Sequence, residues 1–109
     1  MAEGPAIDIA PDHWRIVQTI LRRHVPQFPV WAFGSRAQWR AKPYSDLDLA
    51  IIADAPLSLA TCGALAEAFS ESDLPWRVDI VDWSSTSDEF RKIIERDKVV
   101  LTAGGGGKA

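Results

Sequence analysis

Residues 34–49, GSRAQWRAKPYSDLDL, contain a Gly34-Ser35 turn and, after ten intervening residues, two aspartates, Asp46 and Asp48. Side chains alternate between the two faces of a strand, so both aspartates point to one face, roughly 7 Å apart along the chain. Neighbouring carboxylates repel each other unless a cation lies between them, and an oxygen-only ligand set suits Mg²⁺. A Gly-Ser turn presents backbone N–H groups that can approach phosphate oxygens closely. The segment therefore predicts a site for a metal-bound triphosphate.

Composition limits the class of protein. The chain has 109 residues, of which 47% are hydrophobic and 25% charged, and this predicts one small domain with a single core. The net charge of −3 argues against direct nucleic-acid binding, because such proteins are normally basic. No apolar stretch approaches the ~20 residues of a membrane span. We therefore expect that the protein does not bind membranes. The only cysteine, Cys62, cannot form an internal disulfide, so we expect a cytoplasmic protein.

Hydrophobic periodicity and capping residues divide the chain into alternating helices and strands. We expect helices over residues 12–25, 58–69 and 86–94, a helical turn at 36–41, and strands over 30–33, 46–53, 76–83 and 99–101. Asp12, Ser58 and Thr86 are the expected helix caps. The alternation predicts an α/β domain in which helices cover a small sheet, and it leaves strand order and direction open.

The two ends of the chain differ from the rest in composition. We expect residues 1–11, which include Gly4 and Pro5, to form a loose leader, and residues 12–101 to form the folded domain. Residues 102–109, with glycines at 104–107, are expected to be a flexible tail.

A third carboxylate is needed if this site transfers a nucleotidyl group. Such chemistry uses carboxylates to hold metal ions, donors to hold phosphates, and a further carboxylate to assist the attacking hydroxyl. Asp79 is the best candidate, because it lies inside an apolar strand where an unpaired carboxylate is costly. Asp82 is a weaker candidate, since it lies at the strand's end. The alternative is that Asp79 is a structural residue paired with Arg77.

Several residues of the same segment suit a triphosphate. Gly34 and Ser35 begin a short helical turn, whose N–H groups and dipole favour phosphate oxygens. Arg36, Arg40 and Lys42 add local positive charge to an otherwise acidic chain. Among these three cations, we expect Arg36 to stabilise charge on the triphosphate.

These motifs resemble the minimal nucleotidyltransferases of the DNA polymerase beta superfamily. The shared pattern is Gly-Ser, ten residues and Asp-x-Asp, followed by a strand aspartate that Asp79 matches here. The resemblance covers residues 12–101. It implies a small mixed β-sheet flanked by helices, in the polymerase-beta-like nucleotidyltransferase fold.

The chain departs from this family beside the motif. Gln38-Trp39 stand where the family often has Arg-Gly, and Tyr44 stands where a small or acidic residue is common. Trp39 and Tyr44 are either plain loop aromatics or stack on the base of the nucleotide. These departures concern the nucleotide pocket and leave the three aspartates intact.

The resemblance also implies an activity. Family members transfer AMP from ATP to a hydroxyl, release pyrophosphate and use Mg²⁺, which implies that Asp46, Asp48 and Asp79 are catalytic and metal-binding residues. Stand-alone members of this size resemble antitoxins that adenylylate a tyrosine of a HEPN-domain ribonuclease toxin. The implied partners are therefore ATP and a HEPN toxin, in a hetero-oligomer. Two alternatives stay open: a non-catalytic antitoxin module, and a small-molecule nucleotidyltransferase of the aminoglycoside-modifying type.

Overall fold

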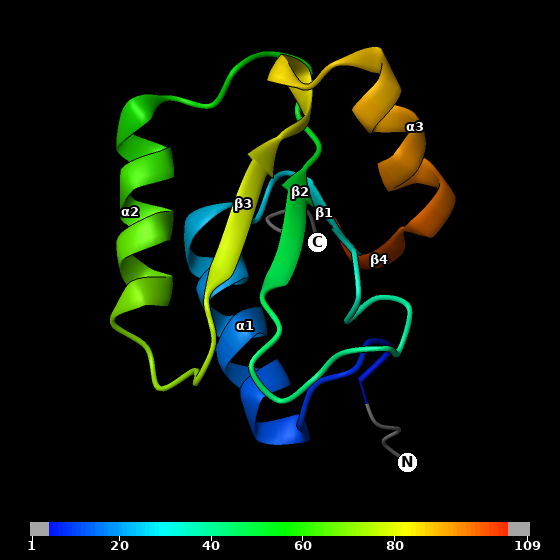
Figure 1. Cartoon of the computed structure of the whole chain (residues 1–109). Coiled ribbons are helices and arrows are strands. Elements are labelled where there is room, and N and C mark those ends of the chain that lie inside the picture. The colour runs from blue at the N-terminus through cyan, green and yellow to red at the C-terminus, as the bar shows by residue number, and fades with distance from the viewer. Residues whose placement is uncertain (1–4, 105–109) are drawn as a thin grey trace.

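The computed structural model describes residues 5–104 and shows an α/β domain (Figure 1). Its elements are α1 (Pro11–His24), β1 (Pro29–Phe33), β2 (Leu47–Ile51), α2 (Leu59–Ser70), β3 (Val78–Asp82), a short 3₁₀ helix η1 (Trp83–Ser85), α3 (Asp88–Asp97) and β4 (Val99–Ala103). The predicted fold class is confirmed. The part of the chain from residue 5 to residue 104 has no helix that is both long and apolar enough to cross a membrane.

The four strands form one mixed sheet in the order β3-β2-β1-β4. β1 pairs antiparallel with both β2 and β4, whereas β2 pairs parallel with β3. A parallel pair needs a crossover between its strands, and α2 supplies it here. In this register Leu47 lies opposite Val78 and Asp48 lies opposite Asp79.

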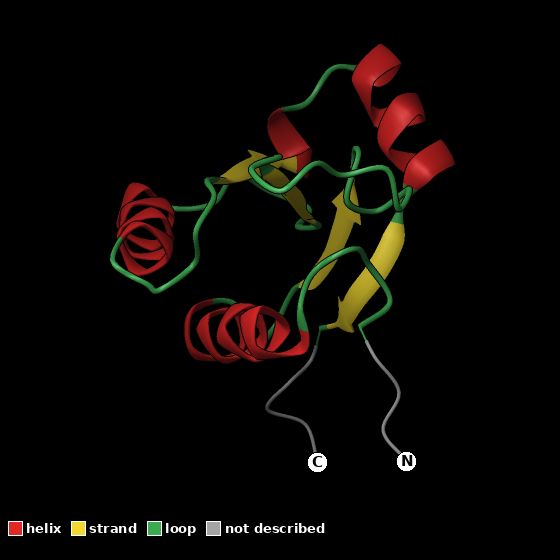
Figure 2. Cartoon of the chain, turned by 60° about the horizontal axis from the view of Figure 1, so that its bottom comes forward, coloured by secondary structure: helices red, strands yellow, loops and turns green. Residues whose placement is uncertain are grey.

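The two faces of the sheet carry different layers. Figure 2 shows α1 and α2 on one side of the sheet and α3 on the other. Leu47, Leu49 and Ile51 of β2 alternate toward α1 and α2, where they join the main hydrophobic core. Ala50 faces the other way and forms a smaller cluster with Phe33 and with Ile94 of α3. By the same alternation Asp48 lies on the α3 face.

The expected boundaries of the domain are wrong at both ends. Ile7 is 0% exposed and belongs to the main core together with Ile9, so this part of the expected leader is packed rather than loose. At the other end β4 continues to Ala103, and Thr102 pairs with Val30, so the tail does not begin at residue 102. Residues 1–4 and 105–109 lie outside the described part of the chain.

Helix capping follows the predictions only for α2. The Ser58 hydroxyl accepts a hydrogen bond from the Thr61 N–H at 3.0 Å, as expected. Asp12 is not the cap of α1, because Pro11 already begins that helix. Thr86 is not the cap of α3, since its hydroxyl donates to the Asp82 carbonyl and Ser87 accepts from the Phe90 N–H instead.

Candidate active site

Two of the expected site residues are direct neighbours across the sheet. Asp48 on β2 and Asp79 on β3 are register partners in the parallel pair. Adjacent strands lie about 4.8 Å apart, so side chains on the same face of such a pair lie close together. Asp46 comes immediately before β2, two residues from Asp48, and its negative charge acts on both Asp48 and Arg36. The sheet thus brings a carboxylate from each of two distant segments to one place.

The electrostatics of the site indicate that the three carboxylates interact. Burial, together with the negative charges of Asp79 and Asp46, raises the pKa of Asp48 to about 6. A carboxyl group surrounded by like charges is stabilised in its ionised form when a cation binds beside it. An all-oxygen set of this kind fits Mg²⁺ in its chemistry.

The three side chains do not yet converge on a single point. Within residues 5–104, no three aspartate, glutamate, histidine or cysteine side chains are close enough together to hold a metal ion. Asp79 instead pairs with Arg77, whose guanidinium nitrogen lies 3.4 Å from the Asp79 carboxylate. The Asp79 side chain is 45% exposed, so this ion pair is accessible to solvent. The structure is therefore compatible with both interpretations of Asp79. It lies opposite Asp48, as a catalytic carboxylate would, and it pairs with Arg77, as a structural residue would.

Gly34 lies against the carboxylate of Asp48. Its φ of +81° is in the left-handed region, which residues with a Cβ rarely adopt. A Cβ at this position would also lie 2.4 Å from Oδ2 of Asp48, well inside the contact distance. The preceding residue, Phe33, is the register partner of Asp48. Antiparallel pairing of β1 with β2 therefore places the Gly34-Ser35 turn beside the aspartates, as the sequence predicted.

Arg36 has a different position from the expected one. Its guanidinium is inside the protein, where the residue is 5% exposed and stacks over the Trp76 ring at 4.3 Å from the centroid. Its N–H groups donate to four backbone carbonyls, those of Asp8, Lys42, Pro43 and Ser45. Burial lowers the Arg36 pKa, whereas the charges of Asp8 and Asp46 raise it. Direct contact of Arg36 with a triphosphate does not fit this geometry.

The hydrogen bonds of Arg36 give it a positioning role. Its Nε donates at 2.9 Å to the carbonyl of Ser45, the residue directly before Asp46. A second bond, at 2.8 Å, runs to the Asp8 carbonyl, and the Asp8 carboxylate accepts from the Ala41 N–H. Arg36 therefore ties the segment that leads into the aspartates to the packed N-terminal segment.

A hollow of about 590 Å³ opens in front of Asp48 and Asp79, whereas Asp46 is not part of its lining. Asp48 and Asp79 line it together with Gly34, and α3 contributes an apolar wall with Phe90 and Ile93, both partly exposed. Its full lining consists of Phe33, Gly34, Asp48, Asp79, Ile80, Val81, Phe90, Ile93 and Asp97. A larger hollow of about 810 Å³ lies between α1 and α2, but the three aspartates do not line it. The chemistry of the side chains therefore favours the smaller hollow as the active site.

Asp82 and Asp97 have roles in the structure that the sequence did not predict. The Asp82 carboxylate accepts hydrogen bonds from the N–H groups of Leu57 and Ser84, so this weaker candidate is a structural residue. Asp97, at the end of α3, lines the hollow and was not expected there. No local pattern marks Asp97, because it reaches the site only through the packing of α3 on the sheet.

The chain is similar to known proteins of one family. Residues 16–103 match the family described as Polymerase beta, Nucleotidyltransferase. Over 101 residues the chain is 56% identical to "Probable protein adenylyltransferase MntA" of Haemophilus influenzae, covering 93% of this chain and 89% of that protein.

Solved structures are similar as well. A toxin–antitoxin structure with AMP-PNP has a TM-score of 0.70 at 26% identity, covering 84% of this chain and 74% of the other. A structure described as a minimal nucleotidyltransferase has a TM-score of 0.64 at 30% identity, covering 83% of this chain and 90% of the other. The chain therefore belongs to the polymerase beta nucleotidyltransferase family, as its motifs predicted.

Proposed function

We propose that this protein is an Mg²⁺-dependent adenylyltransferase that transfers AMP from ATP to a tyrosine hydroxyl of a partner HEPN toxin and thereby acts as its antitoxin. The observation that carries the proposal is the juxtaposition of Asp48 and Asp79 beside the Gly34 turn. The 56% identity to an MntA adenylyltransferase supports the activity. The similar toxin–antitoxin structure that contains AMP-PNP supports ATP as the donor.

The chain's own residues divide the work of this reaction. Asp46 and Asp48 would hold Mg²⁺, which when bound supplies positive charge to the phosphates. The N–H groups at Gly34 and Ser35 would hold phosphate oxygens. Asp79, the more exposed neighbour of Asp48, would take the proton of the acceptor hydroxyl or serve as a further metal ligand.

The transfer itself is a single exchange of bonds at the α-phosphorus. The acceptor oxygen forms a bond to this phosphorus, the bond to the bridging oxygen of the β-phosphate breaks, and pyrophosphate leaves. The apolar wall of Phe90 and Ile93 gives the ring of an acceptor tyrosine a surface to pack against.

A labelling experiment tests this function. The protein is incubated with [α-³²P]ATP, Mg²⁺ and the toxin encoded beside it, and the expected result is label on a toxin tyrosine. We expect Asp79→Asn to lower the transfer rate about 100-fold or more, since one catalytic carboxylate is lost. The matched control is Asp54→Asn, which changes an exposed aspartate after β2.

Two results would contradict the proposal. The first is the absence of label under conditions where the two proteins bind each other. The second is full neutralisation of the toxin in cells by Asp79→Asn, which would favour a non-catalytic antitoxin. Label on an aminoglycoside instead of the toxin would favour the small-molecule alternative.

A further inference from the structure

The burial of Arg36 leaves the triphosphate without its expected cation. A triphosphate carries several negative charges, and positive side chains near the phosphates stabilise it in addition to the metal. Two other cations, Arg40 and Lys42, belong to the same segment, and both residues are exposed. The conformation of the segment distinguishes between them.

The backbone turns back on itself just before Arg40. Trp39 has a φ of +58°, a left-handed conformation that is uncommon for a large side chain. Its indole N–H donates to the carbonyl of Ala6 at 3.1 Å, and this bond anchors the bend. Arg40 then donates its backbone N–H to the Ser35 carbonyl at 2.9 Å. The backbone of Arg40 is therefore held directly against the Gly34-Ser35 turn.

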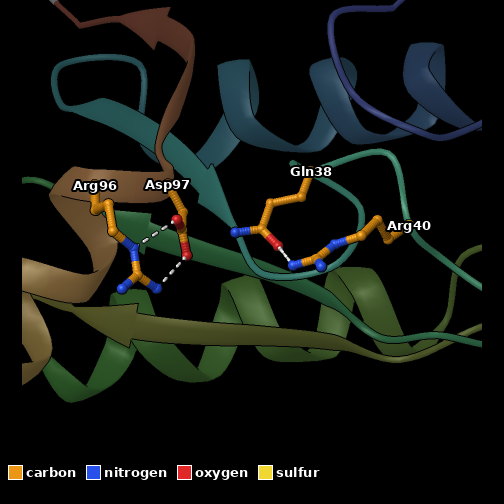
Figure 3. Close-up of polar contacts among 4 residues, drawn as sticks. All are labelled: Gln38, Arg40, Arg96 and Asp97. Carbon is orange, nitrogen blue, oxygen red and sulfur yellow. Dashed lines mark hydrogen bonds and ion pairs between the residues drawn. The ribbon is translucent and has the colours of Figure 1, made fainter.

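The Arg40 side chain extends toward Gln38 (Figure 3). Its guanidinium donates to the side-chain oxygen of Gln38, and this pair lies beside Asp97 and Arg96 at the end of α3 (Figure 3). Arg96 donates to both oxygens of Asp97, at 3.0 and 3.2 Å. Hydrogen bonds from Arg96 and Gln38 lower the Asp97 pKa, and the charge of Arg40 lowers it further. Because Asp97 lines the hollow, Arg40 lies within electrostatic reach of the site.

We propose that Arg40 binds the terminal phosphates of ATP, and that Gln38 holds its guanidinium near the Gly34-Ser35 turn until the nucleotide takes its place. This inference rests on the proposed function, since it names the nucleotide-binding cation of that site. A guanidinium forms paired hydrogen bonds with phosphate oxygens, which suits this role. Asp97 lines the hollow and pairs with Arg96, and its negative charge opposes an incoming triphosphate.

Binding of a nucleotide that is not consumed tests the inference. Affinity for Mg²⁺ and α,β-methylene-ATP is measured by calorimetry on the whole chain, with AMP as a comparison ligand. Arg40→Ala is expected to weaken binding of the ATP analogue about tenfold and of AMP much less, because one charge-assisted contact to the terminal phosphates is lost. Arg40→Lys keeps the charge and is expected to lose less than Arg40→Ala.

Asp97→Asn is expected to change affinity for the ATP analogue in the opposite direction from Arg40→Ala. Removing its negative charge is expected to tighten binding of the analogue about threefold, and this gain is expected to shrink when Arg40→Ala is also present. Arg15→Ala is the matched control, since Arg15 is an exposed arginine of α1 in the hollow on the other face of the sheet. Circular dichroism checks that each variant is folded.

Failure of this inference is distinguishable from failure of the proposed function. Unchanged affinity in folded Arg40→Ala, with normal binding by the unaltered chain, would overturn the assignment of Arg40 alone. A tenfold loss in Lys42→Ala instead would transfer the role to Lys42. Weaker binding in Asp97→Asn would contradict the opposing effect of the Asp97 charge, whereas no binding by the unaltered chain would overturn both proposals.

Discussion

Among single residues, Gly34 in the turn after β1 has little freedom to change. Its backbone is in the left-handed region, and the space that a Cβ would take is already filled by the Asp48 carboxylate. These two requirements are independent of each other, since one concerns the conformation of the turn and the other the approach of β1 to β2. Together they link a glycine in the phosphate turn to the position of a proposed metal ligand.

Gly34→Ala is expected to lower the rate of AMP transfer about 100-fold, because the new methyl group displaces the carboxylate of Asp48. The measurement is kcat/KM for labelled transfer to the toxin. Gly63→Ala is the control, since the Cβ of residue 63 meets no atom within 4 Å and lies on α2. Gly63→Ala is expected to be neutral or to stabilise the helix by about 0.5–1 kcal/mol. Equal activity of the two variants would contradict this prediction.

Asp48 gives a prediction about pH. Its pKa is raised to about 6 in the folded protein, above the value of 3.8 of an unperturbed aspartate. The folded state therefore holds this proton more tightly than the unfolded state, and stability without metal falls as pH rises from about 4 to 6.

Asp48→Asn removes this loss of stability. With EDTA present, we expect the variant to exceed the unaltered chain in free energy of unfolding by about 1 kcal/mol at pH 7.5, a value reduced for solvent screening. The difference is expected to vanish near pH 4 and to shrink when Mg²⁺ is added. Urea unfolding at the two pH values is the measurement, and a difference independent of pH would refute the electrostatic explanation.

At the scale of elements, the segment between β1 and β2 determines where the carboxylates lie. It contains no regular helix or strand, and the buried Arg36 donates to three of its carbonyls and to the Asp8 carbonyl of the N-terminal segment. The first part of this segment, from Gly34 to Gln38, is a turn closed by backbone hydrogen bonds to the Gly34 carbonyl. Hydrogen bonds from a side chain and within a turn thus stabilise the segment between β1 and β2, whereas pairing within the sheet stabilises the two strands.

Arg36→Ala is expected to lower the free energy of unfolding by about 2–4 kcal/mol, because it leaves buried carbonyls without donors. Arg36→Lys is expected to recover only part of this loss, since an ammonium group lacks the guanidinium's flat array of donors. Arg22→Ala, which changes an exposed arginine of α1, is the control. Unchanged stability together with weaker ATP binding would instead return Arg36 to the phosphate site.

The apolar wall on α3 leads to a prediction about the acceptor. Ile93→Ser is expected to raise KM for the toxin about fivefold and to leave nucleotide affinity unchanged, because Ile93 is partly exposed at the rim of the hollow. Leu59→Ser on α2, where the side chain is 90% exposed, is the control. Kinetics with varied toxin concentration separate the two variants, and equal KM values would show that the acceptor does not contact this wall.

For the whole molecule, the main hydrophobic core and the candidate active site lie on opposite faces of the sheet. The face toward α1 and α2 carries the main core, and the face toward α3 has a smaller core beside the open hollow. The N-terminal segment belongs to the first of these, because Ile7 and Ile9 complete the main core. The carboxylates therefore rest on a well-packed layer while one side of them stays accessible.

Ile7→Ala tests the contribution of the N-terminal segment to this layer. We expect it to lower the free energy of unfolding by about 2–4 kcal/mol, since it leaves a cavity in the main core. Leu59→Ala at an exposed position is expected to change stability by less than about 0.5 kcal/mol. Thermal or urea unfolding provides the measurement, and equal stabilities would mean that Ile7 does not contribute to the core.

Local patterns were sufficient for the α/β class, the Gly34-Ser35 turn and the Ser58 cap. Each of these depends on residues near one another in the chain, where the periods of strands and helices apply directly. The polymerase beta resemblance rested on the same short motifs and was confirmed.

Contacts between distant segments decided the rest. The parallel pairing that sets Asp48 opposite Asp79, the burial of Arg36 among carbonyls, the packing of Ile7 and the approach of Asp97 to the hollow all join residues far apart in the chain. No local period encodes such contacts, because they arise when hydrophobic faces of separate elements pack together and buried polar groups find partners.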